Sequence, residues 1–82
     1  MKKYVIASFY KFVPLTDYLS IKEPLLEKMR EHGVFGTIIL ASEGINGGAA
    51  GTPAAMMALY SYLKSEPLFQ DLLFKETFYH YN

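Results

Sequence analysis

The chain has 82 residues, 51% of them hydrophobic and 16% aromatic, and its formal net charge at pH 7 is zero. This size and composition predict one small domain with a packed core and argue against disorder. The balance of basic and acidic residues argues against a dedicated nucleic-acid-binding protein, because such a protein usually carries a strong basic excess. Any contact with a polyanion would therefore be local. There is no cysteine, which excludes disulfides and thiolate chemistry and fits a reducing cytoplasm. No apolar run approaches the length of a membrane span, so we expect a cytoplasmic protein without a membrane partner.

The first predicted element is a strand from Lys3 to Val13, rich in β-branched and aromatic residues and ended by Pro14. Alternation gives it two largely apolar faces, as expected for a central strand. One face carries Val5, Ala7, Phe9 and Lys11, and the other carries Tyr4, Ile6, Ser8 and Tyr10. The sequence leaves open which of the two faces is covered.

The second predicted element is a helix from Tyr18 to Gly33. Its apolar stripe at helical spacing consists of Tyr18, Ile21, Leu25 and Met29, with Leu26 beside it. Pro24 interrupts the stripe. Either a first turn capped by Asp17 breaks there, or the main helix starts with Pro24 near its first position. Gly33 is a typical stop signal.

Two further strands follow, from Val34 to Ala41 and from Ile45 to Gly51, with a turn at Ser42 to Gly44. Three of the seven residues in the later strand are glycine. Glycine within a strand marks a bulge or a place where another backbone or a ligand comes close. We therefore single out Glu43-Gly44-Ile45-Asn46-Gly47 as the most informative segment of the chain.

The second helix is predicted to start at Thr52 and Pro53, an N-cap followed by proline at the first helical position. Its apolar face contains Met56, Leu59, Tyr60 and Leu63, and it ends near Ser65. A connector, Leu68 to Asp71, leads to a last strand from Leu72 to about Tyr79.

The resulting order is β-α-β-β-α-β, which predicts an α+β, ferredoxin-like fold with a four-stranded antiparallel sheet and two helices on one face. The other face of the sheet would remain open and largely apolar. Such a face suggests a surface for a partner, and pairing of two copies through it would give a homodimer.

The glycine-rich segment has two interpretations. Its backbone amides could bind an anion, with Glu43 and Asn46 adding polar contacts. Alternatively, Asn46-Gly47 is a favoured turn pair, and because hairpin turns are common we favour this second interpretation. The segment is not a Walker loop, since no Gly-Lys-Ser/Thr follows, and a strand rather than a helix comes next, unlike in a dinucleotide fingerprint.

The sequence predicts no catalytic residue, metal site or cofactor. His32 and His80 lack ligand-like spacing, and the third strand lacks the aromatic residues of an RNA-recognition motif. An acylphosphatase would need an arginine after the first strand, but the only arginine is Arg30. Lys11 and Lys75 would lie on neighbouring strands if the strand order is 4-1-3-2. The ordinary interpretation is that both lysines are simply solvated surface charges. The more specific alternative is that they form a small patch that faces phosphate.

Two blocks of sequence carry a resemblance to a known family. They are Ser8-Phe9-Tyr10-Lys11-Phe12 and the segment from Phe35 to Gly47 that ends in Glu-Gly-Ile-Asn-Gly. Together they resemble the amino-terminal domain of the bacterial rhodanese-domain tRNA uridine-34 hydroxylase family, over nearly the whole chain from Tyr4 to about Phe78. The resemblance implies a longer protein that makes 5-hydroxyuridine at the wobble position with molecular oxygen. It also implies a following rhodanese domain that carries an essential cysteine.

On this resemblance, residues 1–82 form one ferredoxin-like, acylphosphatase-like domain, the amino-terminal fragment of a longer tRNA-modifying enzyme. We expect the fragment alone to be inactive and to help in binding tRNA or in positioning the rhodanese domain. The family motifs suggest docking positions at Tyr10, Lys11, Glu43, Asn46 and Gly47, to which the strand order adds Lys75. The alternative is a self-standing protein-interaction or dimerisation module without a role in nucleic-acid binding.

Overall fold

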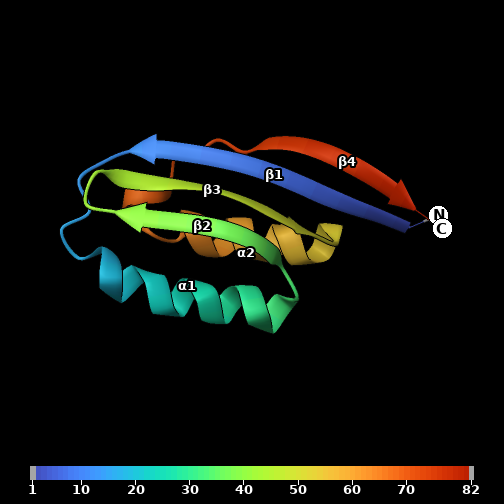
Figure 1. The fold of residues 1–82 in the computed structure, drawn as a ribbon, viewed down its shortest axis with the longest axis horizontal. Coiled ribbons are helices and arrows are strands. Elements are labelled where there is room, and N and C mark those ends of the chain that lie inside the picture. Colours follow the sequence, from blue (N-terminus) through green and yellow to red (C-terminus); the bar gives the residue numbers. More distant parts are fainter. Residues whose placement is uncertain (1, 82) are drawn as a thin grey trace.

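The computed structural model describes residues 2–81 of the chain, and the side chains of residues 3–80 (Figure 1). Its elements are β1 (Lys2–Phe12), α1 (Tyr18–His32), β2 (Phe35–Ala41), β3 (Gly44–Gly51), α2 (Pro53–Lys64), the 3-10 helix η1 (Pro67–Phe69) and β4 (Lys75–Tyr81). The strands pair antiparallel in the order β2-β3-β1-β4. Both helices lie on the same side of the sheet (Figure 1). The predicted ferredoxin-like fold is confirmed.

Strand β1 is central, as its two apolar faces predicted, and burial shows which face the helices cover. Val5, Ala7 and Phe9 are buried, whereas Ile6 and Tyr10 are exposed. The covered face meets the helices in one hydrophobic core, whose buried members are Val5, Ala7, Phe9, Leu15, Leu25, Met29, Val34, Ile45, Ala49, Ala55, Met56, Leu59, Leu63, Phe69 and Leu72. The face that carries Tyr4, Ile6 and Tyr10 is therefore the open one.

Helix α1 runs without interruption through Pro24, so both interpretations of this proline were wrong. Asp17 makes no side-chain capping bond. The stripe is confirmed: Leu25 and Met29 are buried, and the other predicted members pack against the core. This packing holds the helix together although Pro24 has no N–H to donate. Gly33 ends the helix, as predicted, and it adopts the left-handed conformation with φ of 70°.

Helix α2 begins as predicted, because the Thr52 hydroxyl accepts a hydrogen bond from the amide of Ala55 at 3.2 Å. The segment after it differs from the prediction, since it contains the short helix η1 and the last strand begins at Lys75 rather than at Leu72. Leu72 is buried in the core instead.

The β2–β3 hairpin turns at Ser42 and Glu43, within the predicted turn region, and Ala41 pairs with Gly44. The interpretation of Asn46-Gly47 as the turn pair was wrong, because both residues lie inside β3. The chain after β1 fastens the turn: the amide of Val13 donates to the carbonyl of Glu43, and that of Leu15 to Ser42, each at 2.9 Å. The hairpin end and the end of β1 thus form one rigid corner.

Between residues 2 and 81, no helix is long and apolar enough to cross a membrane.

Candidate functional site

The open face of the sheet is organised in rows of cross-strand partners, which share a face in an antiparallel sheet. From the hairpin end, the rows are Phe12, Gly44 and Ala41; then Tyr10, Asn46 and Ile39; then Lys75, Ser8, Gly48 and Thr37; then Thr77, Ile6, Ala50 and Phe35. The third row is small or polar. It separates two groups of exposed apolar side chains, one at each end of the face.

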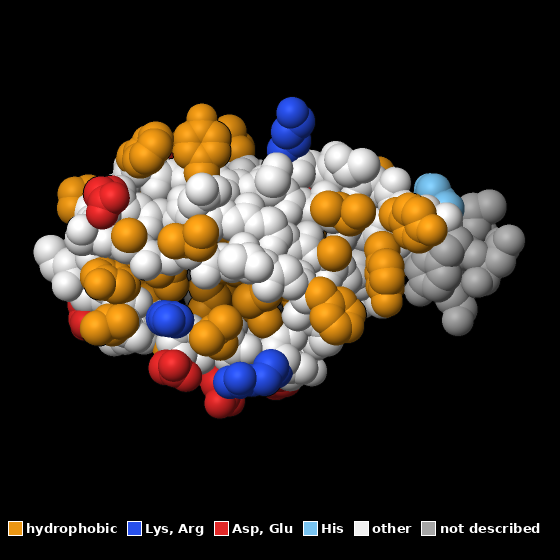
Figure 2. All heavy atoms as spheres, viewed as in Figure 1, with side chains coloured by type: hydrophobic (Ala, Val, Ile, Leu, Met, Phe, Trp, Pro, Cys, Tyr) orange, Lys and Arg blue, Asp and Glu red, His pale blue; other side chains and the backbone are white. Residues whose placement is uncertain are grey.

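Figure 2 shows hydrophobic side chains gathered at the end of β1 and again toward the opposite end of the molecule. The charged side chains lie mainly along the edge formed by α1 (Figure 2). The open face is therefore a surface for stacking and apolar contact more than for ionic contact.

A hollow of 440 Å³ lies at the hairpin end of the open face. It is lined by Tyr10, Lys11, Phe12, Ile39, Ala41, Glu43, Gly44, Ile45 and Asn46. Four of the six predicted site residues, namely Tyr10, Lys11, Glu43 and Asn46, are in this lining. The hollow is where strands β1, β2 and β3 come together beside the turn.

Aromatic and aliphatic side chains form the walls of the hollow. The rings of Tyr10 and Phe12 meet edge to face, with centroids 5.8 Å apart. Tyr10 is 69% exposed, Phe12 83% and Ile39 59%. Phe12 and Ile39 were not predicted as site residues, although the alternation that places Tyr10 on this face also places Phe12 there.

Asn46 lies between Tyr10 and Ile39 in the second row. Its side chain is exposed, and its amide makes no hydrogen bond to any residue in the described part of the chain. The backbone around it is fully used, because β3 pairs with β1 and β2 along its length. The backbone amides of β3 are therefore not available for the anion cradle, which was the less favoured interpretation, and what Asn46 offers is its side-chain amide.

Glu43 stands at the rim, on the turn. Its carboxylate accepts a hydrogen bond of 3.0 Å from the hydroxyl of Ser42. Beside it, Gly44 approaches β1 closely: a Cβ there would lie 2.1 Å from the carbonyl oxygen of Lys11. Any side chain at position 44 would therefore collide with the backbone of β1.

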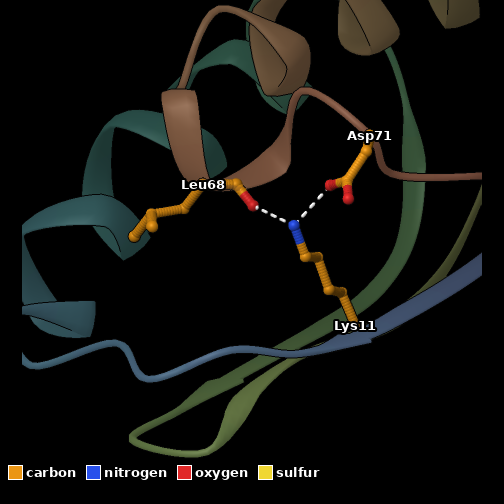
Figure 3. A network of polar contacts seen from close by, with 3 residues as sticks. All are labelled: Lys11, Leu68 and Asp71. Atoms are coloured by element: carbon orange, nitrogen blue, oxygen red, sulfur yellow. Dashed lines mark hydrogen bonds and ion pairs between the residues drawn. The ribbon is translucent and has the colours of Figure 1, made fainter.

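The ammonium group of Lys11 does not point onto the open face (Figure 3). Its Nζ donates to the carbonyl oxygen of Leu68 at 2.7 Å and to the carboxylate of Asp71. This hydrogen bond, together with the positive charge of Lys11, lowers the pKa of Asp71 below its ordinary value. Lys11 thus ties the end of β1 to η1 and to the segment that follows it.

Lys75 pairs with Ser8 and lies on the open face, whereas Lys11 pairs with Ile45 on the covered face. The predicted neighbourhood of their strands is confirmed, but the two ammonium groups do not form a common patch. Lys75 lines a second groove of 500 Å³ that runs along β1 beside Leu72 to Phe74.

Gly47 is on the covered face, opposite Phe9 and Ile38. A Cβ at this position would lie 2.9 Å from the carbonyl oxygen of Thr37 and 3.0 Å from the Cα of Ile38. Close packing of β3 against β2 explains this glycine, and it contributes no group to the hollow.

The described side chains contain no cluster of three or more His, Asp or Glu residues that could hold a metal ion. Arg30 is near the end of α1, where it pairs with Glu27 at 3.6 Å. It is remote from the loop after β1, where an acylphosphatase would need its arginine. The lining of the hollow presents two aromatic rings, an aliphatic wall, the side-chain amide of Asn46 and the carboxylate of Glu43.

Comparison with known proteins gives the family. Residues 4–81 match the family model described as UPF0176 acylphosphatase like domain. The chain is also 58% identical over 78 residues to proteins named tRNA uridine(34) hydroxylase from Legionella pneumophila strains Corby, Lens and Paris. These matches cover 95% of this chain but only 31% of each relative. The chain therefore belongs to the UPF0176 acylphosphatase-like domain family.

Proposed function

We propose that this chain is the accessory amino-terminal domain of a cytoplasmic protein that hydroxylates uridine 34 of tRNA, and that the hairpin end of its open sheet face contacts the tRNA. The relatives that share 58% of the matched residues carry this activity in their name. They are about three times as long as the matched segment, since it covers 31% of them. The chemistry of hydroxylation is therefore assigned to the remainder of such a protein, which by family resemblance includes a rhodanese domain.

The observation that carries the proposal is the hollow at the hairpin end. Tyr10, Glu43 and Asn46, which the family motifs suggested from sequence, line it together. Exposed aromatic rings on a sheet beside a polar amide are the groups with which proteins hold single-stranded RNA. Glu43 is the only acidic residue in the lining, and the ammonium group of Lys11 is hydrogen-bonded to Leu68. The hollow therefore offers apolar and hydrogen-bonding contacts to RNA rather than a site for phosphate.

The test uses the complete gene product that carries this domain. Tyr10→Ala and Asn46→Ala should weaken tRNA binding and lower the fraction of uridine 34 converted to 5-hydroxyuridine, measured by mass spectrometry of tRNA digests. Phe35→Ala is the matched control, because Phe35 is equally exposed on the same face but at the far end. Unchanged tRNA affinity and unchanged modification in both hollow variants would refute a tRNA-contact role.

A second candidate function, a protein-interaction or dimerisation module, is favoured by the other apolar group on the open face. Ile6, Phe35 and Tyr79 are exposed there, at 43%, 65% and 57%. Sedimentation velocity of the chain and of Phe35→Lys separates the two functions. A dimer that Phe35→Lys dissociates would assign this end of the face to protein contact.

A further inference from the structure

We propose that the hollow binds one unpaired nucleobase of single-stranded RNA, stacked on the ring of Tyr10 or Phe12 and hydrogen-bonded along its edge by Asn46. This inference rests on the proposed function and deepens it, because it names the chemical group that the open face takes and the residues that hold it.

The first step is the stacking surface. Tyr10 and Phe12 follow each other on the same face of β1, and their interplanar angle is 64°. In this edge-to-face contact the edge of one ring covers one face of the other, so the remaining faces are available for stacking, and both side chains are more than two-thirds exposed. Every base has a π-face, so these rings accept a base without regard to its identity. Ile39 closes the opposite wall of the hollow.

The second step is the amide of Asn46. Its carbonyl oxygen accepts hydrogen bonds and its NH₂ group donates them, and both are without partners among residues 2–81. The edge of each unpaired base presents an acceptor next to a donor, which matches one side-chain amide. Apolar neighbours on both sides strengthen such bonds because they exclude competing water. A base whose edge is already paired or methylated cannot make them.

The third step is room and charge. The hollow of 440 Å³ is open to the surface and has Ala41 and Gly44 on its floor, so a flat ring can enter. Lys11 is bound to Leu68 and Asp71, which leaves no free cation in the lining to grip phosphate. Binding by this site alone is therefore weak, and stacking of one base improves affinity by about 5- to 150-fold. The geometry thus points to recognition of a base rather than of the RNA backbone.

The experiment titrates the ¹⁵N-labelled chain with pentauridylate and with the same oligonucleotide methylated at every uracil N3. Methylation blocks the hydrogen-bonding edge and leaves the stacking face intact. We expect amide shifts confined to residues around the hollow, and about tenfold weaker binding of the methylated RNA. Asn46→Ala should bring the two affinities together. Whichever of Tyr10→Ala and Phe12→Ala removes the stacking ring should weaken both, and Phe35→Ala should change neither.

Shift changes outside the hollow, equal binding of both oligonucleotides to the unchanged chain, or no binding at millimolar RNA would each overturn the inference. So would protection of the hollow by another part of the complete gene product. The proposed function can fail separately. If the hollow binds pentauridylate as expected, but the hollow variants leave tRNA modification by the complete gene product unchanged, then the base-binding site is confirmed and its role in tRNA modification is refuted.

Discussion

At the scale of single residues, glycine at position 36 determines how closely β2 approaches β3. Gly36 has φ of 134°, and a Cβ there would lie 2.2 Å from the carbonyl oxygen of Gly48. Alanine at this site therefore meets both backbone strain and a clash with backbone that cannot move aside. We predict that Gly36→Ala lowers the free energy of unfolding by at least about 2 kcal/mol, measured by urea denaturation.

Gly48→Ala is the matched control on the neighbouring strand. A Cβ at position 48 would lie 3.7 Å from the carbonyl oxygen of Ala7, an ordinary contact. This substitution should be neutral, or stabilising by about 0.4–1 kcal/mol, because alanine restricts the unfolded chain. Equal destabilisation by both substitutions would show that the close approach of the backbones at Gly36 is not the cause of the lost stability.

The contact of Lys11 with Asp71 predicts a pH-dependent contribution to stability. Since the pKa of Asp71 is lowered on folding, its contribution is complete above the ordinary pKa of aspartate and disappears as the pH falls through the lowered value. Asp71→Asn should therefore lower the melting temperature slightly at pH 7, and the difference from the unchanged chain should vanish in strong acid. In a Lys11→Met background, Asp71→Asn should have no such pH dependence. A difference that persists at pH 2 would contradict this assignment.

At the scale of elements, Pro24 is the weak point of α1. It lies exposed within the helix and offers no N–H to the carbonyl of Ser20, four residues earlier. Proline within a helix destabilises the folded state by about 3 kcal/mol relative to alanine. Its rigidity also restricts the unfolded chain, which stabilises the fold by about 0.4–1 kcal/mol. The first effect is larger, so Pro24→Ala should raise the free energy of unfolding by about 2 to 2.6 kcal/mol, the difference between the two effects.

Pro53→Ala provides the control with the opposite sign. Pro53 occupies the first helical position of α2, where no N–H is needed and the fixed φ suits the helix. Replacing it should leave stability unchanged or reduce it. If Pro24→Ala is also neutral or destabilising in urea unfolding followed by circular dichroism, the ring of Pro24 must make a contribution that outweighs the missing bond.

Hydrophobic periodicity is the reason that the elements themselves could be predicted. The stripe of α1, the apolar face of α2 and the alternation in β1 all reflect burial against one core, and each is confirmed. The break at Pro24 could not be foreseen because tertiary packing of Leu25 and Met29 outweighs a local penalty. The late start of β4 has a similar cause, since burial of Leu72 depends on contacts across the fold.

Turn chemistry was misleading at Asn46-Gly47. A turn there would leave only four residues for the return strand before Thr52, whereas the turn at Ser42 and Glu43 leaves eight for β3. Ladder pairing along the longer strand outweighs the local preference of an Asn-Gly pair. The same pairing turns Asn46 from a turn residue into the central polar group of the hollow.

The candidate site could be predicted in part. Tyr10 and Asn46 follow from the family motifs, but the direction of Lys11 depends on Leu68 and Asp71, nearly sixty residues away. Local sequence contains no signal for such a contact. Ile39 was missed because its face depends on the register between β2 and β3, which only the position of the turn decides.

At the scale of the whole molecule, the sheet separates two kinds of surface. One face is covered by helices, and α1 presents charged side chains of both signs along its outer side. The other face is open and apolar, and Lys75 is the one lysine or arginine in its four central rows. With a formal net charge of zero, the molecule has little long-range attraction for a polyanion. In the proposed base site, affinity for RNA must then come from stacking and hydrogen bonds.

This distribution of charge predicts how RNA binding by the chain depends on salt. Each phosphate neutralised on a single strand contributes a slope of about −0.7 to the plot of log affinity against log salt concentration. Lys75 is the available cation, so the plot for pentauridylate binding should have a slope no steeper than about −0.7. The slope is measured by titration between about 50 and 500 mM salt. Lys75→Gln should flatten it further, with Lys22→Gln on α1 as the control. A slope several times steeper would mean that the chain grips the RNA backbone, and the assignment of the open face to base contact would then be wrong.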